Sequence, residues 1–129
     1  MTVVGVGVDL VHVPSFAEQL AVAGSRFDRA FTPGERGDAR DRPSGPERHL
    51  AARWAAKEAV IKAWSASIHG RPPVTDEFVH HLVEVVTDAW NRPAIRLHGK
   101  VATHLADHTV HVSLSHDADY AIAHVTLTA

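Results

Sequence analysis

The sequence of 129 residues contains no cysteine. It therefore forms no disulfide, offers no thiolate nucleophile and has no Cys-ligated zinc site, which is typical of proteins in the reducing cytosol. It also has no run approaching the ~20 apolar residues that span a bilayer. The N-terminal segment Met1–Gly5 lacks the basic start and the long apolar stretch of a signal peptide. We therefore expect a soluble, cytoplasmic protein with no membrane segment.

An excess of charge of one sign is missing as well. The net charge is −2 and the isoelectric point is near 6.6, whereas general nucleic-acid binding favours a strongly basic domain, so we expect no nucleic-acid partner. Arginines are nevertheless concentrated between residues 26 and 53, among acidic residues. Such a segment forms a solvated face, an anion site or a docking surface. The length and the ordinary apolar and charged content predict one globular domain over residues 1–129.

The longest predicted helix covers residues 47–67, which contain neither glycine nor proline and are rich in alanine. At 3.6 residues per turn, Glu58 and Lys62 lie on one side of this helix with Trp54. The opposite side carries small residues that suit close packing: Ala52, Ala56, Ala59 and Ala63. A helix that is apolar on nearly every side is usually buried. Glu58 and Lys62 are then either charges at a protected surface or a solvent-exposed pair at i, i+4.

A valine-rich segment over residues 2–13 predicts a buried strand. By alternation, one face of this strand carries Val4, Val6, Val8 and Leu10. The other face carries Gly5, Gly7, Asp9 and Val11. Two glycines beside a lone carboxylate indicate that another group approaches this backbone closely.

Asp9 and Glu58 lie on two elements that are both predicted to be buried, where carboxylates are seldom left unpaired. Magnesium usually takes one or two carboxylates together with waters and phosphate oxygens. The pair, with Lys62 one turn beyond Glu58, therefore predicts a magnesium site that receives substrate phosphates. The alternative is a structural cluster of ion pairs.

The rest of the chain predicts an α+β domain with an antiparallel-leaning sheet packed on the one long helix. A short helix is expected over residues 15–23, and a capping box at Thr32 and Glu35 begins another. Glycine and proline at residues 70–73 end the helical part. Strands are expected over residues 81–87 and 94–97, a short helix over 100–107, and a hairpin over 110–115 and 120–127.

Several segments together resemble the holo-[acyl-carrier-protein] synthase family, the small 4'-phosphopantetheinyl transferases. They are GVGVDL at residues 5–10, FTPGE at 31–35, ARWAAKEAVIKA at 52–63, and VSLSH at 112–116 followed by YAIA at 120–123. The matches occur in the order of the family and span essentially the whole chain. The helix motif is the most specific of them.

The resemblance implies a reaction. Members of the family transfer the 4'-phosphopantetheine arm of coenzyme A to a serine of an apo acyl carrier protein and release adenosine 3',5'-bisphosphate, in support of fatty acid biosynthesis. The resemblance implies that Asp9 and Glu58 hold Mg²⁺ against the pyrophosphate of coenzyme A. It also implies that Glu58, directly or through a water molecule, is the base for the carrier serine, and that Lys62 neutralises charge on the phosphate.

Further contacts with the coenzyme are implied for Arg53 and Lys57, as anion ligands, and for His116 near the nucleotide. Short members of the family form homotrimers with sites shared between subunits, and this chain is of the short type. Many members carry a basic residue early in the first helix that helps to dock the acidic carrier, but residues 13–16 carry none. Docking is therefore expected through Phe16, or through the arginines from Arg26 onward.

Two alternatives stay open. One is a transferase of broader specificity that also primes polyketide-synthase or peptide-synthase carriers, or a type I fatty-acid synthase. The other is a catalytically silent module that binds coenzyme A. Residues 63–67 lack the glycine-rich turn of many relatives, which leaves the contacts at the edge of the coenzyme unassigned.

Overall fold

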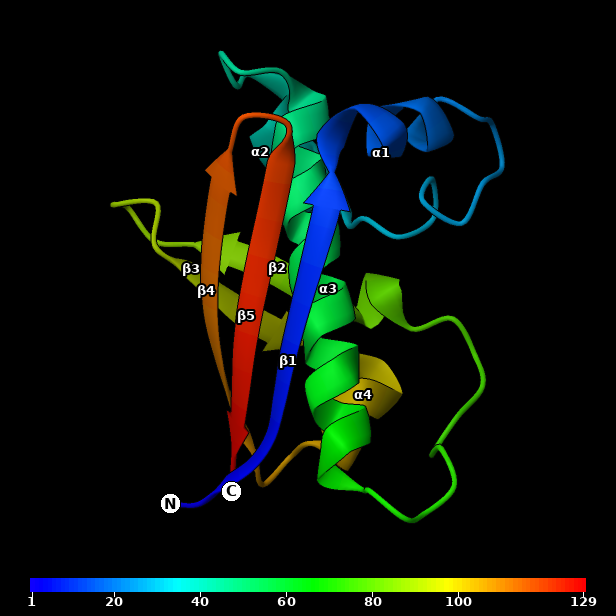
Figure 1. The fold of residues 1–129 in the computed structure, drawn as a ribbon, viewed down its shortest axis with the longest axis vertical. Coiled ribbons are helices and arrows are strands. Elements are labelled where there is room, and N and C mark those ends of the chain that lie inside the picture. The colour runs from blue at the N-terminus through cyan, green and yellow to red at the C-terminus, as the bar shows by residue number, and fades with distance from the viewer.

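The computed structural model describes residues 1–129 and confirms the predicted α+β class. Three strands form one antiparallel sheet in the order β1 (Val3–His12), β5 (Tyr120–Thr128) and β4 (Thr109–Asp117). The strands β2 (Val83–Thr87) and β3 (Pro93–Leu97) form a second antiparallel pair. The helix α3 (Pro46–Ser67) runs along one face of the larger sheet (Figure 1). No helix is both long and apolar enough to cross a membrane.

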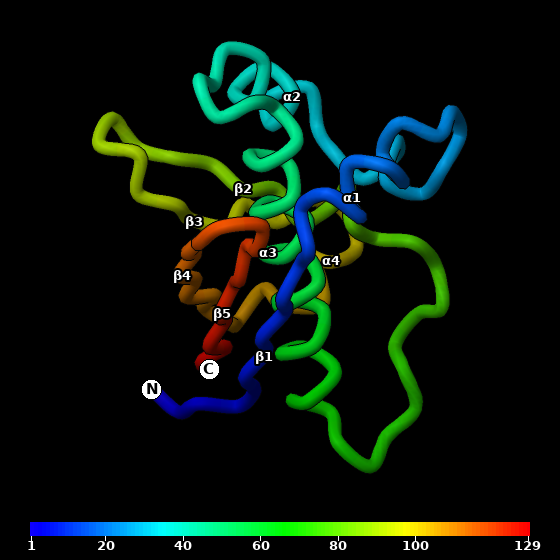
Figure 2. Tube along the Cα trace, turned by 45° about the horizontal axis from the view of Figure 1, so that its top comes forward, coloured from blue at the N-terminus to red at the C-terminus, as the bar shows by residue number.

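Shorter helices and loops lie around α3. They are α1 (Val13–Leu20), α2 (Pro33–Arg40), α4 (Gly99–His104) and the 3-10 helix η1 (His80–Leu82). In both views the hairpin of β2 and β3 lies on one side of α3, whereas α1 and the loop of residues 68–79 lie on the other (Figure 2). The molecule therefore has two distinct flanks, separated by α3 and the strand β5.

The close packing of α3 on β1 depends on glycine. A Cβ atom added to Gly5 would lie 2.0 Å from the backbone oxygen of Ala63, and one added to Gly7 would lie 2.0 Å from that of Ala59. Both alanines are fully buried. The prediction that another group approaches this backbone closely is confirmed, because the glycines let the helix backbone touch the strand.

The outer face of β1 differs from the prediction. Val6, Val8 and Leu10 are 55%, 51% and 61% exposed, although the strand was predicted to be buried. The prediction was wrong for this face because α3 covers only one side of the sheet, and nothing in the chain covers the other. The pairing of Leu10 with Ile122 and of His12 with Tyr120 extends the exposed apolar face onto β5.

The predicted capping box is confirmed, and it begins α2. The Thr32 hydroxyl accepts a hydrogen bond from the Glu35 amide at 3.1 Å, and a Glu35 carboxylate oxygen accepts one from the Thr32 amide at 2.9 Å. The predicted hairpin of β4 and β5 is also confirmed, with a tight turn at Ala118 and Asp119. The strand expected from residue 81 begins only at Val83, because residues 80–82 form the turn of η1.

Candidate active site

One cluster of charges joins β1 to α3 at the point where the glycine contact ends. Asp9 follows Gly7 on the face of β1 that is turned toward α3, and its side chain is only 15% exposed. The Lys62 ammonium donates hydrogen bonds to the Asp9 carboxylate and to the Val8 carbonyl, each at 3.0 Å. Burial raises the pKa of Asp9 above its ordinary value, and the charge of nearby Glu58 raises it further, while Lys62 opposes both. Asp9 thus pairs with a half-exposed lysine, and the charge of a second carboxylate, Glu58, acts on it.

Glu58 lies one turn before Lys62 on α3 and faces His80 at the start of η1. The distance from the His80 Nε2 atom to the Glu58 Oε1 atom is 3.4 Å. The His80 imidazole holds the pKa of Glu58 below its ordinary value, with burial acting in the opposite direction. Glu58 is therefore ionised at neutral pH, as a cation ligand or a proton acceptor must be.

His80 was not identified from the sequence. It stands 22 residues beyond Glu58 in the chain, next to a second histidine, His81, and no motif distinguishes the two. Only the fold, which lays η1 beside α3, brings His80 to Glu58.

The donor set fits magnesium. No group of three or more His, Asp or Glu side chains is placed to hold a metal ion, so the chain builds no closed zinc-type site. Asp9 and Glu58 are two neighbouring carboxylates, the number that magnesium uses when waters and phosphate oxygens complete its coordination. A cation there would also oppose the burial and the Glu58 charge that together raise the pKa of Asp9.

Lys57, predicted as an anion contact, lies in the interior. Its ammonium donates to the Glu35 carboxylate at 2.8 Å, the Val83 carbonyl at 2.6 Å and the His80 carbonyl at 3.0 Å, and its side chain is fully buried. The second Glu35 oxygen accepts from the Val85 amide at 2.9 Å. The prediction for Lys57 is wrong, because all three of its donor hydrogens are used to join α3 to α2, η1 and β2.

Arg53 and His116, the other predicted coenzyme contacts, meet near the N-terminal end of α3. They line a polar cavity of about 190 Å³ together with Arg42, Arg48 and His49. Arg53 is 9% exposed and makes no ion pair. Burial lowers the pKa of Arg53, and the charge of Arg42 lowers it further. A cavity lined by cations that lack a carboxylate partner is suited to an anion such as a phosphate.

These two groups of residues lie on opposite flanks of the molecule. Asp9 is on β1 and His116 on β4, which form the two edges of the sheet with β5 between them. On α3, Arg53 precedes Glu58 by five residues, which turns the two side chains about 140° apart around the helix axis. The structure therefore places Asp9, Glu58 and Lys62 together, and it places Arg53 and His116 together. Within one chain, these two groups lie apart from each other.

The predicted docking residue Phe16 is 3% exposed. It packs edge-on against Phe27 and Phe31, with ring centroids 5.4 and 6.2 Å away. The prediction that the carrier docks through Phe16 is therefore wrong, since its ring is part of the core.

Arg26, the first of the predicted docking arginines, is exposed. Its guanidinium lies 5.5 Å from the centre of the Trp54 ring, and its charge acts on Glu58.

Two carboxylates and a lysine on one flank, with a cationic cavity on the other, are groups that can position and stabilise a phosphate-bearing group during its transfer by an enzyme. The particular family is shown by comparison with known proteins. The chain belongs to the 4'-phosphopantetheinyl transferase superfamily, whose family model matches residues 5–125.

Similar proteins agree with this assignment. The chain is 59% identical over 123 residues to a holo-[acyl-carrier-protein] synthase of Mycobacterium ulcerans, covering 95% of each chain. It is 57% identical over 129 residues to that of Mycobacterium tuberculosis H37Rv, covering 100% of this chain and 99% of the relative. Among solved structures, the Mycobacterium tuberculosis acyl carrier protein synthase matches with a TM-score of 0.82 and 53% identity over 99% of both chains. A Chronobacterium ammoniagenes synthase in complex with coenzyme A matches with a TM-score of 0.88 and 48% identity over 95% of both chains.

Proposed function

We propose that this protein is a cytoplasmic holo-[acyl-carrier-protein] synthase. It transfers 4'-phosphopantetheine from coenzyme A to a serine of an apo acyl carrier protein, for fatty acid biosynthesis, and releases adenosine 3',5'-bisphosphate. The observation that carries the proposal is the cluster of Asp9, Glu58 and Lys62 at the contact of β1 with α3. The family membership and the names of the relatives support the same reaction.

In the proposed reaction the serine oxygen attacks the pantetheine-linked phosphorus of coenzyme A, and the bond from that phosphorus to the bridging oxygen breaks. Glu58 takes the serine proton, directly or through water, for which its lowered pKa keeps it ionised. Asp9 and Glu58 would hold Mg²⁺, which when bound neutralises the pyrophosphate charge. Lys62 is 52% exposed, so its ammonium is free to turn from Asp9 to the phosphate and to stabilise the charge on the leaving bisphosphate.

The nucleotide end of coenzyme A is assigned to the cationic cavity of Arg53 and His116. One chain alone does not place this cavity beside Asp9 and Glu58, because they lie on opposite flanks. A closed ring of identical chains would join the two flanks if the β4 edge of one subunit met the β1 edge of the next. The exposed apolar face of Val6, Val8 and Leu10 supplies a surface that such an assembly would cover. We therefore propose a homotrimer with sites between subunits.

The acyl carrier protein is assigned to the flank of α1. Arg26 and Arg29 are exposed there, and Arg26 lies close enough to Glu58 for its charge to help lower the pKa of that carboxyl. An acidic carrier held by these arginines would present its serine to Glu58.

The direct test is intact-mass spectrometry of an apo acyl carrier protein incubated with the protein, coenzyme A and Mg²⁺, with and without a chelator. The expected result is a gain of one phosphopantetheine that the chelator abolishes. No gain on any of several carriers, with the protein shown to be folded, would favour the silent coenzyme-binding module. A panel with polyketide-synthase, peptide-synthase and type I fatty-acid-synthase carriers separates the broader transferase from the narrow one.

The proposal that sites are shared between subunits has a sharper test than the mass of the assembly. Glu58→Gln removes one half of the proposed site, and His116→Ala removes the other. Each variant alone should be nearly inactive. When the two variants are mixed, unfolded and refolded together, mixed trimers should regain activity, because some sites then combine an intact Glu58 from one subunit with an intact His116 from another. Light scattering should give the mass of three chains. A fully active monomer, or no regain of activity in mixed trimers, would contradict the shared site.

A further inference from the structure

The side chain of His80 is held between two aromatic rings. It stacks on Trp54 with ring centroids 4.5 Å apart and planes within 6° of parallel, and it lies against Phe78 at 4.5 Å and 29°. Trp54 is one turn before Glu58 on α3, so the ring that supports His80 and the carboxylate that faces it share one helix face. The stack fixes the plane of the imidazole.

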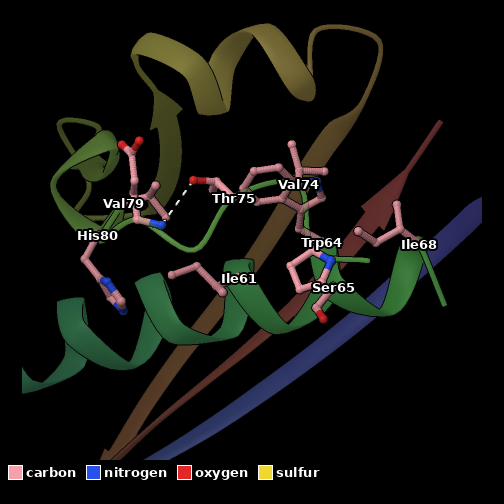
Figure 3. A pocket seen from close by; sticks show the side chains of 10 residues that line it. Ile61, Trp64, Ser65, Ile68, Val74, Thr75, Val79 and His80 are labelled. Carbon is pink, nitrogen blue, oxygen red and sulfur yellow. Dashed lines mark hydrogen bonds between the residues drawn. The ribbon is translucent and has the colours of Figure 1, made fainter. Parts of the chain in front are cut away.

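The backbone of His80 is fixed as well. Its carbonyl accepts a hydrogen bond at 3.0 Å from Lys57, the buried ammonium that also binds Glu35. In Figure 3, His80 lies at one end of a cavity of about 170 Å³ between α3 and the loop of residues 73–80, with Ile61 beside it. His80 therefore lines this cavity and also faces Glu58.

The edge of the imidazole faces Glu58 without completing a hydrogen bond. The His80 Nε2 atom is 3.4 Å from the Glu58 Oε1 atom, and neither ring nitrogen has a hydrogen-bond partner although the side chain is only 13% exposed. An unpartnered buried donor is unfavourable, and a small rotation of Glu58 would satisfy it. Catalytic hydrogen bonds are often long before substrate binds and shorten in the complex.

We propose that His80 is a positioning residue for Glu58. By donating its Nε2 hydrogen to the Oε1 atom, the fixed imidazole holds the Oε2 atom toward the carrier serine and the cation. This inference rests on the proposed function. The groups that orient a metal ligand or a base commonly matter nearly as much as the ligand itself.

Two substitutions separate the donor from the ring. His80→Phe keeps a ring in the stack but removes the donor, whereas His80→Gln keeps an N–H donor and loses the ring. We expect His80→Phe to lower kcat about 10- to 100-fold, with an unchanged melting temperature and a KM for coenzyme A within about twofold of the wild type. His80→Gln should restore a large part of the lost kcat. His81→Phe, the same change at the exposed neighbouring residue, is the matched control and should leave kcat unchanged.

A double-mutant cycle with Glu58→Gln tests whether His80 acts through Glu58. His80→Phe should have no further effect on the residual turnover once the carboxylate is gone. A second readout needs no turnover: calorimetric titration of the free protein with Mg²⁺ alone should show weaker binding in His80→Phe than in His81→Phe.

Three outcomes would overturn the inference: full kcat in His80→Phe, an equal loss in His80→Gln with an unchanged melting temperature, or the same loss whether or not Glu58 is present. A wild-type protein that modifies no carrier refutes the proposed function instead. An active wild type with an active His80→Phe refutes only the role of His80.

Discussion

Lys57 and Lys62 lie five residues apart on α3, and each forms an ion pair of nearly the same length with a carboxylate from another element. The Lys57–Glu35 distance is 2.8 Å and both side chains are fully buried. The Lys62–Asp9 distance is 3.0 Å, and these side chains are 52% and 15% exposed. Lys57 also donates to two carbonyls, so no hydrogen of its ammonium is left, whereas Lys62 has one carbonyl partner besides Asp9.

The difference shows that the surroundings of an ion pair decide its role more than its length does. Removing one partner of a buried pair leaves an uncompensated charge in the interior. An exposed pair contributes at most about 1 kcal/mol, and its lysine is free to change partner. We therefore assign the Lys57 pair to stability and the Lys62 cluster to chemistry. The following predictions separate these assignments.

The largest effect is expected at Glu58, in the chemical cluster. Glu58→Gln keeps the shape of the side chain but removes the base and a charged cation ligand, so turnover should fall by about 1,000-fold or more. The melting temperature should stay unchanged, because the side chain is partly exposed. Rates of carrier modification measure the loss, and Glu47→Gln, at an exposed residue near the start of α3, is the control. Near-normal turnover in Glu58→Gln would remove Glu58 from the site.

The next largest effect is expected in the buried pair. Lys57→Met leaves Glu35 charged in the interior and should lower the free energy of unfolding by about 3–5 kcal/mol. Denaturant unfolding measures the loss, and the double variant Lys57→Met with Glu35→Gln should regain part of it. The folded fraction should keep its KM for coenzyme A. A selective rise of that KM with little loss of stability would restore Lys57 as an anion contact.

The sequence predicted the features that depend on neighbouring residues. Three such features are confirmed: the alanine-rich helix α3, the capping box of Thr32 and Glu35, and the glycines of β1 that lie against α3. The site of Asp9, Glu58 and Lys62 is predicted from two carboxylates on buried elements and from helical spacing, the family resemblance adds their roles, and the fold places the three together.

The features that were missed depend on contacts between distant elements. Periodicity does not tell Lys57 from Lys62, because the burial of Lys57 depends on Glu35, 22 residues earlier in the chain. The exposed face of β1 depends on which side of the sheet α3 covers, and an alternating strand of valines is compatible with either outcome. His80 reaches Glu58 only through the packing of η1 on α3.

A smaller effect on turnover is expected at Lys62. Lys62→Ala removes one charged donor from the transferring phosphate and should lower kcat about 100-fold. Stability should change by less than about 1 kcal/mol, since Lys62, the residue removed, is half exposed. Steady-state kinetics with varied carrier, together with unfolding of the same variant, measure both. A change confined to the KM for the carrier would refute the assigned role, and Lys100→Ala, at a lysine on α4, controls for the loss of charge.

The smallest effect is expected from His49, two turns before Lys57 on the buried side of α3. Burial, and then the charges of Arg53 and Arg42, lower the pKa of His49 to about 4 in the folded protein. In the unfolded chain histidine titrates near 6.5, so between these values the unfolded state binds more protons and stability falls as the pH falls. Above about pH 7 the contribution is complete, and by pH 4 most of it should be lost.

His49→Leu tests this pH dependence, because leucine fills the site without titrating. The difference in unfolding free energy between wild type and His49→Leu should be constant above about pH 7 and should move against the wild type as the pH falls toward 4. Parallel curves would show that His49 is protonated in the folded state. If the curves diverge, the buried neutral imidazole of His49 contributes to the stability of α3. Because His49 also lines the cavity of Arg53 and His116, the KM of His49→Leu for coenzyme A is measured separately from its stability.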